Sequence, residues 1–138
     1  IHQTNVTLVQ VGVRDQSVEE YRLATAHPRI HQVTDRRFRQ NPYDAVISEI
    51  LAPLPEFVWV SFDVDGLDPA LCPGTGTPVP GGLSWHEATG LLLALARSGR
   101  RIVGFDLCEV GPTEWDAIVG ARLLYLLASC AIHAGARQ

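Results

Sequence analysis

The stretch that most constrains the fold is "FVWVSFDV", residues 57–64, which has the pattern of a buried strand. Successive side chains of a strand point to opposite faces, and the first half of this stretch is apolar on both. That composition is typical of a parallel strand covered by helices. A helical pattern at 84–98 and a second apolar run at 101–109 follow it. This strand–helix–strand order predicts two parallel strands that end at the same edge of a sheet.

The remaining segments continue the alternation of strands and helices, which predicts an α/β fold with a mainly parallel sheet. Two capping boxes, Ser17 with Glu20 and Ser84 with Glu87, mark helix starts, and Thr113 is the expected cap of the closing helix. Further strands are expected at 5–13 and 29–33, and further helices at 17–27, 34–40, 43–52 and 113–135.

Three carboxylates are expected at the edge where the two central strands end. Asp63 and Asp65 share one strand face, with Cα atoms roughly 6.5–7 Å apart, and Glu109 ends the second strand. Ligands of open α/β sheets bind at this edge, and such a separation suits carboxylates that share one or two cations. The alternative, in which Asp63 or Asp65 only caps the following loop, is equally compatible with the spacing.

Composition excludes several classes of protein. A net charge of −4 argues against nucleic-acid binding, and no apolar run reaches the roughly 18–20 residues that span a bilayer. Three scattered cysteines suit reduced thiols in the cytoplasm better than a disulfide framework. The chain contains no methionine, so we expect it to be part of a longer polypeptide.

The stretch "SFDVDGLDPALCPGTGTPVPGG", residues 61–82, resembles the signature of the ureohydrolases, the family of arginases, agmatinases and formimidoylglutamases. "FDLCEV", followed by a proline, is similar to the second motif of the family. The resemblance extends from "VQVGVRD" to the final helix. It implies that residues 1–138 are the C-terminal half of one ureohydrolase domain, a three-layer mainly parallel sheet with helices on both faces. The signature positions are filled by Ser61, Asp63, Asp65, Pro69, Pro73, Gly74 and Gly82.

The resemblance also implies a chemistry, the hydrolysis of a linear guanidino or amidine C–N bond with release of urea or a related amide. Two manganese ions would activate the attacking water; Asp63 would bridge both ions and Asp65 would bind one. Glu109 would be the catalytic group that orients the substrate guanidinium through charge-assisted hydrogen bonds. The residues implied to line or support the site are Thr75 and Thr77 in the loop, and Ser61 and Asp106 behind the ligands. A cytoplasmic homo-oligomer, a trimer or hexamer, is implied as well.

Three departures from the family pattern qualify this reading. The upstream histidine and Asp-x-His-x-Asp ligands are missing, so we expect the isolated chain to be inactive. Ser17 stands where arginases carry an acidic group that contacts the substrate, which leaves arginine, agmatine, formimidoylglutamate and other guanidino compounds open. Gly111 replaces an asparagine and is expected to loosen its loop.

Two alternative functions remain at this stage. The chain could belong to a non-catalytic protein that keeps the ureohydrolase fold for assembly or regulation. It also resembles, more weakly, haloacid-dehalogenase-like phosphatases, in which an apolar strand ends in "FDxDG". Their next residue is usually threonine, and here it is Leu67.

Overall fold

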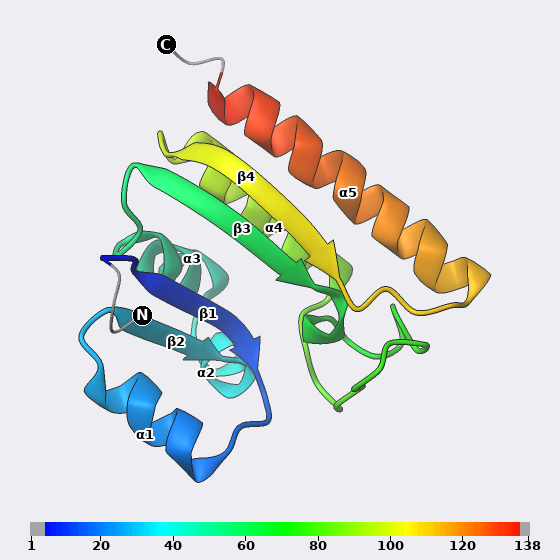
Figure 1. Ribbon diagram of the computed structural model, residues 1–138, viewed down its shortest axis with the longest axis horizontal. Helices are drawn as coiled ribbons and strands as arrows, with labels where there is room; N and C mark the ends of the chain where they lie inside the picture. Colours follow the sequence, from blue (N-terminus) through cyan, green and yellow to red (C-terminus); the bar gives the residue numbers. More distant parts are fainter. Residues whose placement is uncertain (1–4, 136–138) are drawn as a thin grey trace. The chain divides into compact units, whose positions relative to one another are not determined.

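The computed structural model describes residues 5–135, and the chain divides into two compact units, Ile1–Pro55 and Glu56–Gln138. Each unit contains a two-stranded parallel sheet with helices attached, which confirms the predicted α/β class (Figure 1).

The first unit contains the strands β1 (Leu8–Val13) and β2 (Ile30–Thr34), paired in parallel. Its helices are α1 (Val18–Ala26), α2 (Asp35–Gln40) and α3 (Tyr43–Leu51). The predicted capping box is confirmed, since the Glu20 amide donates to Ser17 Oγ at 3.2 Å and the Ser17 amide donates back to Glu20 Oε2 at 2.7 Å. The predicted strand 5–13 begins three residues late, at Leu8. The buried core consists of Val33, Phe38, Val46, Ile47 and Ile50.

The second unit contains β3 (Phe57–Asp63), α4 (Trp85–Arg97), β4 (Arg101–Cys108) and α5 (Glu114–Gly135). β3 and β4 are parallel, with Phe57 opposite Arg101 at one end and Asp63 opposite Cys108 at the other. The two strands therefore finish at the same edge, as predicted. Both predicted caps are also present, since the Glu87 amide donates to Ser84 Oγ and the Asp116 amide to Thr113 Oγ1.

The strand ends differ from the prediction by one residue each. β3 stops at Asp63, and Asp65 lies in a short 3₁₀ turn, η1 (Val64–Gly66), so the two aspartates do not share a strand face. The Asp63 carboxylate accepts a hydrogen bond from the Asp65 amide at 3.3 Å. This local side-chain bond offers the backbone an alternative to the sheet, and it confirms that Asp63 caps the following turn.

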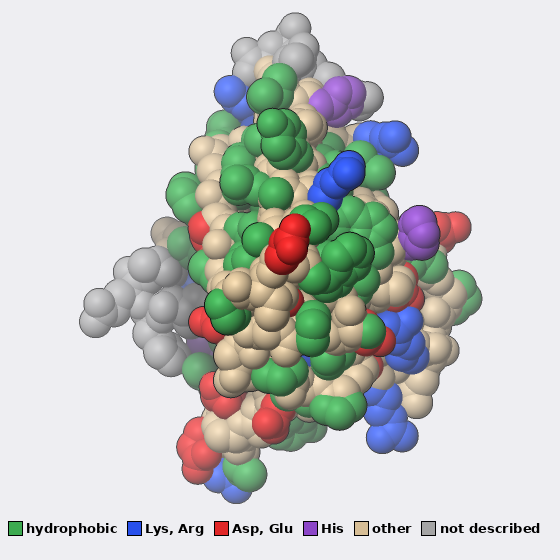
Figure 2. Space-filling model, turned by 90° about the vertical axis from the view of Figure 1, so that its right-hand side faces the viewer, with side chains coloured by type: hydrophobic (Ala, Val, Ile, Leu, Met, Phe, Trp, Pro, Cys, Tyr) green, Lys and Arg blue, Asp and Glu red, His purple; other side chains and the backbone are tan. Residues whose placement is uncertain are grey.

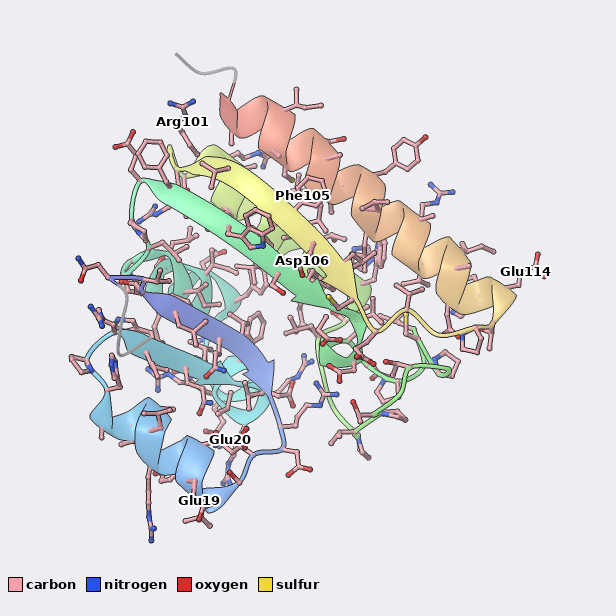
Figure 3. The ribbon with its side chains drawn as sticks, viewed as in Figure 1. Glu19, Glu20, Arg101, Phe105, Asp106 and Glu114 are labelled. Carbon is pink, nitrogen blue, oxygen red and sulfur yellow. The ribbon has the colours of Figure 1, made fainter. Side chains whose placement is uncertain are left out.

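The two faces of the β3–β4 sheet differ in exposure. Val58 and Ile102 are buried on one face, and α4 passes behind the sheet while α5 runs alongside β4 (Figure 1). Phe57, Trp59 and Val103 are more than half exposed in this chain. Figure 3 shows Arg101 at the start of β4, where its guanidinium lies 5.5 Å from the centroid of the Phe57 ring.

The helix α5 is long and apolar enough to cross a membrane by length and composition, contrary to the expectation from the sequence. This is weak evidence for a membrane span, because the core helix of a soluble protein has the same properties. One side of α5 packs on β4 and α4. Figure 2 shows hydrophobic side chains spread over the face on the α5 side of Figure 1. The large apolar residues of α5 that are exposed are Trp115, Ile118, Leu124, Tyr125 and Ile132.

Two adjacent leucines test the packing of α5. Leu123 is 0% exposed and Leu124 is 48% exposed. Leu123→Ala should lower the free energy of unfolding by about 2–5 kcal/mol, because it leaves a cavity in the core. Leu124→Ala should change it by about 0.5 kcal/mol or less, as is usual at the surface. Urea unfolding followed by far-UV circular dichroism, without detergent, measures both. Equal losses of unfolding free energy for the two variants would show that the side of α5 that carries Leu124 is buried as well.

Candidate metal and substrate site at the strand ends

The loop between β3 and α4 contacts both acidic segments through consecutive residues. Thr75 Oγ1 donates to the main-chain oxygen of Glu109 at 2.9 Å, and Thr77 Oγ1 donates to Asp65 Oδ2 at 2.7 Å. Between them, a Cβ added at Gly76 would lie 3.1 Å from Glu109 Oε2. Residues 75–77 therefore bridge the end of β3 and the end of β4, while the predicted contact of Thr75 and Thr77 with a substrate stays a prediction. We call residues 74–77 the bridging segment.

The carboxylate of Asp63 is in an unfavourable electrostatic environment. Its pKa is raised, mainly by partial burial and then by the negative charges of Asp65 and Glu109. The hydrogen bond from the Asp65 amide opposes this shift. Asp63 therefore lies within electrostatic range of the other two acids predicted at this edge.

Glu109 has a backbone conformation that the sequence did not indicate. It lies one residue beyond β4 with φ at 61°, in the left-handed region that residues other than glycine rarely adopt. Such a conformation costs roughly 1–2 kcal/mol and persists only when surrounding contacts hold it. The hydrogen bond from Thr75, which is buried, holds the carbonyl of Glu109 in place.

Ser61 and Asp106 lie together on the exposed face of the β3–β4 sheet, because they are register partners. Asp106 accepts hydrogen bonds from Ser61 Oγ and Trp59 Nε1, both at 2.7 Å, and from Cys108 Sγ at 3.4 Å. The bonds from Ser61 and then Trp59 lower the pKa of Asp106. Figure 3 labels Asp106 on β4. Ser61 and Asp106, both predicted to support the site, are therefore neighbours, and their supporting role stays a prediction. Trp59 and Cys108 were missed, although the period of two places Trp59 on this face.

A second buried carboxylate lies beside the bridging segment. Asp116, on α5, is 0% exposed and accepts hydrogen bonds from the amides of Gly74 and Thr113, both at 3.2 Å, and from the Thr113 hydroxyl. The bond from the Thr113 hydroxyl is the main cause of the lowered pKa of Asp116. The pattern Thr-x-x-Asp could have indicated the local bonds, but nothing in the sequence indicated the bond to Gly74.

The expectation for Gly111 was wrong. A Cβ at this position would collide with the carbonyl carbon of Gly74 and approach Asp116 Oδ2 to 2.6 Å. The missing side chain permits close packing between the loop and the turn after β4. Glycine therefore tightens this contact where the sequence predicted that it would loosen it.

The donor set at the strand ends suits part of a cation site. Asp63 and Asp65 offer hard carboxylate oxygens, the ligands that Mn²⁺ shares with Mg²⁺ and Ca²⁺. Within residues 5–135, however, no group of three or more histidine, cysteine, aspartate or glutamate side chains has the geometry to hold a metal ion. Two carboxylates are fewer ligands than an octahedral ion needs, so a complete site would require further donors.

Comparisons with known proteins agree with this geometry. The chain is 41% identical over 121 residues to the N(1)-aminopropylagmatine ureohydrolase of Thermus thermophilus, covering 86% of this chain and 40% of that protein. It is 40% identical over 129 residues to the agmatinase of Proteus mirabilis, covering 88% of this chain and 40% of that one. The chain thus spans about 40% of the length of these relatives.

Solved structures show the same fold. The proclavaminate amidino hydrolase of Streptomyces clavuligerus superposes with a TM-score of 0.78 at 30% identity, over 91% of this chain and 43% of that one. The arginase of Bacillus caldovelox gives a TM-score of 0.77 at 32% identity, over 86% of this chain and 42% of that one. The sequence profile described as the Arginase family matches residues 2–130, which takes in both parallel strand pairs and the bridging segment. The chain therefore belongs to the arginase family, with the fold of a partial arginase-like domain.

Proposed function

We propose that this chain is the C-terminal part of a single-domain, manganese-dependent ureohydrolase that hydrolyses a linear guanidino or amidine C–N bond, releasing urea or a related amide. The observation that carries the proposal is the bridging segment, which contacts Asp65 and Glu109 within three residues of the loop. The relatives support the substrate class, since they are named as an aminopropylagmatine ureohydrolase and an agmatinase.

In this proposal Asp63 and Asp65 would contribute carboxylate ligands to the manganese pair. When bound, the manganese pair would supply a water activated for attack on the guanidinium carbon. The pKa of Asp63 is raised by desolvation first and then by repulsion from Asp65 and Glu109, and a bound cation would offset both effects, which supports this role. Thr77 holds one carboxylate oxygen of Asp65 and so restricts how Asp65 can turn.

Glu109 would orient the substrate by accepting charge-assisted hydrogen bonds from the guanidinium. Its left-handed backbone, held by the bond from Thr75 to its carbonyl, sets the direction in which its side chain leaves the main chain. Asp106 has a different role, because Ser61, Trp59 and Cys108 already donate to its two oxygens. It would support the strand face beside Asp63 without binding a metal.

The isolated chain should be inactive, since two carboxylates leave most positions of a metal pair unfilled and the remaining ligands would come from outside this chain. Membership in the arginase family argues against the phosphatase alternative, while a non-catalytic relative of the ureohydrolases is the alternative that experiment must exclude. Ser17 serves as the cap of α1, so the substrate among guanidino and amidine compounds stays open.

We also propose a cytoplasmic homo-oligomer, a trimer or hexamer, without nucleic-acid or membrane partners. The exposed apolar side chains of α5, among them Trp115, Tyr125 and Ile132, support self-association. Free cysteines at all three cysteine positions support a reducing compartment.

A chimera tests the activity. In it, this chain replaces the matching segment of the Thermus thermophilus N(1)-aminopropylagmatine ureohydrolase, which supplies the rest of the domain. With Mn²⁺ the chimera should release urea from N(1)-aminopropylagmatine or agmatine, while the 138-residue chain alone should release none. Asp63→Asn in the chimera should lower the rate by more than the ~10–100-fold typical of changes outside the ligand set.

The matched control is Asp68→Asn. Asp68 is an exposed aspartate of the same loop whose carboxylate accepts from the Ala70 amide, and its loss should leave the rate unchanged. A folded chimera that binds manganese and releases no urea, or equal rates for the parent and Asp63→Asn, would support the non-catalytic alternative. Circular dichroism and metal content establish folding and loading.

The charges at the strand ends give a second prediction. Because the pKa of Asp63 is raised in the folded chain, its ionised form opposes folding at neutral pH. In the metal-free chain at pH 7, Asp63→Asn should therefore raise the free energy of unfolding. The gain should shrink as the pH falls below the pKa of Asp63 in the folded chain, and it should vanish below the pKa of Asp63 in the unfolded chain. The side-chain oxygen of the new asparagine can still accept the hydrogen bond from the main-chain amide of Asp65.

Asp106→Asn is the matched opposite case. The pKa of Asp106 is lowered, so its ionised form stabilises the fold above the pKa of the unfolded chain. The substitution should lower the free energy of unfolding at pH 7, and the difference should shrink as the pH falls through the folded pKa. Urea unfolding with a chelator present measures both variants. Two changes of the same sign would contradict this electrostatic account.

A further inference from the structure

Asp116 is a buried carboxylate for which the proposed reaction has no direct use. It lies in the first turn of α5, and its two oxygens are held by donors from two separate segments. Oδ1 accepts from the amide of Gly74, 42 residues away in the sequence, and Oδ2 accepts from the amide and hydroxyl of Thr113. Burial of a carboxylate is costly unless such bonds compensate it.

The backbone around Asp116 is packed closely enough to depend on these bonds. A Cβ at Gly74 would collide with Asp116 Oδ2, and a Cβ at Gly111 would collide with the main chain of Gly74. Three segments therefore meet at this carboxylate: the bridging segment, the turn after β4 and the start of α5.

The contacts next to Gly74 connect this packing to the candidate site. Thr75, the following residue, donates to the carbonyl of Glu109 and so holds its left-handed conformation. Gly76 lies beside the Glu109 carboxylate, and Thr77 donates to Asp65. A shift of Gly74 away from Asp116 would move the residues that hold Glu109.

We propose that Asp116 is a positioning residue, which anchors the bridging segment through Gly74 and thereby sets the orientation of Glu109 toward the guanidino group of the substrate. This role rests on the proposed function, in which Glu109 binds the guanidinium. The hydrogen bonds of Asp116 go to Gly74 and Thr113, and in this proposal Asp116 is neither a metal ligand nor a substrate contact. Its loss therefore weakens substrate binding without removing metal ligands.

A simpler role for Asp116 is the capping of α5. The Asp116 amide donates to Thr113 Oγ1 while the Thr113 amide donates to the Asp116 carboxylate, the same reciprocal pattern as Ser84 with Glu87 at α4. Capping would stabilise the helix but would not order the loop. Thr113→Val separates the two roles, because it removes the capping hydroxyl and keeps the Asp116–Gly74 bond.

Amide hydrogen exchange of the 138-residue chain, read by NMR, tests the anchor without any activity. In the parent, the Gly74 amide should exchange at least tenfold more slowly than the amide of the exposed Gly81. Asp116→Ala should abolish this protection and speed exchange at Thr75. Thr113→Val and Glu87→Ala should lower the melting temperature but keep the protection of Gly74. Equal exchange at Gly74 and Gly81 in the parent would overturn the proposal, even if Asp116→Ala did not fold.

The chimera described above tests the consequence for the substrate. Asp116→Ala should raise KM for N(1)-aminopropylagmatine by about tenfold or more, with kcat within about twofold and manganese content unchanged, as expected for lost ground-state binding. Thr113→Val should leave KM unchanged. A lower kcat at constant KM would reflect a smaller folded fraction and would overturn the positioning role in favour of a structural one.

The exchange experiment and the kinetics of the chimera can fail independently of each other. A chimera that releases no urea counts against the proposed function, and the exchange of Gly74 then decides alone whether Asp116 anchors the loop. Loss of protection together with an unchanged KM would show an anchored loop that does not position Glu109, which would also overturn the proposal.

Discussion

Parallel hydrogen bonding between β3 and β4 makes both strands finish at one edge, and the candidate site depends on this pairing. Asp63 and Cys108 are register partners, so Asp65 and Glu109, which follow them in the chain, start from neighbouring points. The pairing also brings Ser61 beside Asp106 on the exposed face. The loop that leaves this edge returns to it, and Thr75 and Thr77 complete the arrangement by bonding to the two acidic segments.

Three aspartates of this unit fall into two electrostatic classes. Asp106 and Asp116 receive several hydrogen bonds from neutral donors, and both have lowered pKa values. The pKa of Asp63 is raised by desolvation and by two nearby carboxylates. A fold gains stability from acids of the first class and loses it to acids of the second. Perturbed pKa values of this kind are common at functional sites, which is why Asp63 supports a cation site better than Asp106 or Asp116 does.

The elements that depend on neighbours in sequence were predicted well. The capping boxes at Ser17 and Ser84 bond residues three apart, and the structure confirms both. The strand ends were less predictable. Hydrophobic alternation continues through Val64, but the Asp63 carboxylate accepts a hydrogen bond from the Asp65 amide, and the chain turns out of the sheet there. The alternation of apolar and polar residues predicts which face of the sheet each side chain occupies. It does not predict where a polar side chain will compete with the sheet for a backbone amide.

By itself, the sequence determined the α/β class, the parallel pairing and the arginase-family signature, because these follow from periodicity and from residues at fixed local spacing. Only the tertiary structure decided how the site is held. The bonds from Trp59 to Asp106, from Thr75 to Glu109 and from Gly74 to Asp116 join residues 47, 34 and 42 positions apart. Such bonds depend on the path of the whole loop and on how closely glycine backbones can approach a buried carboxylate, and no local pattern of residues encodes that path.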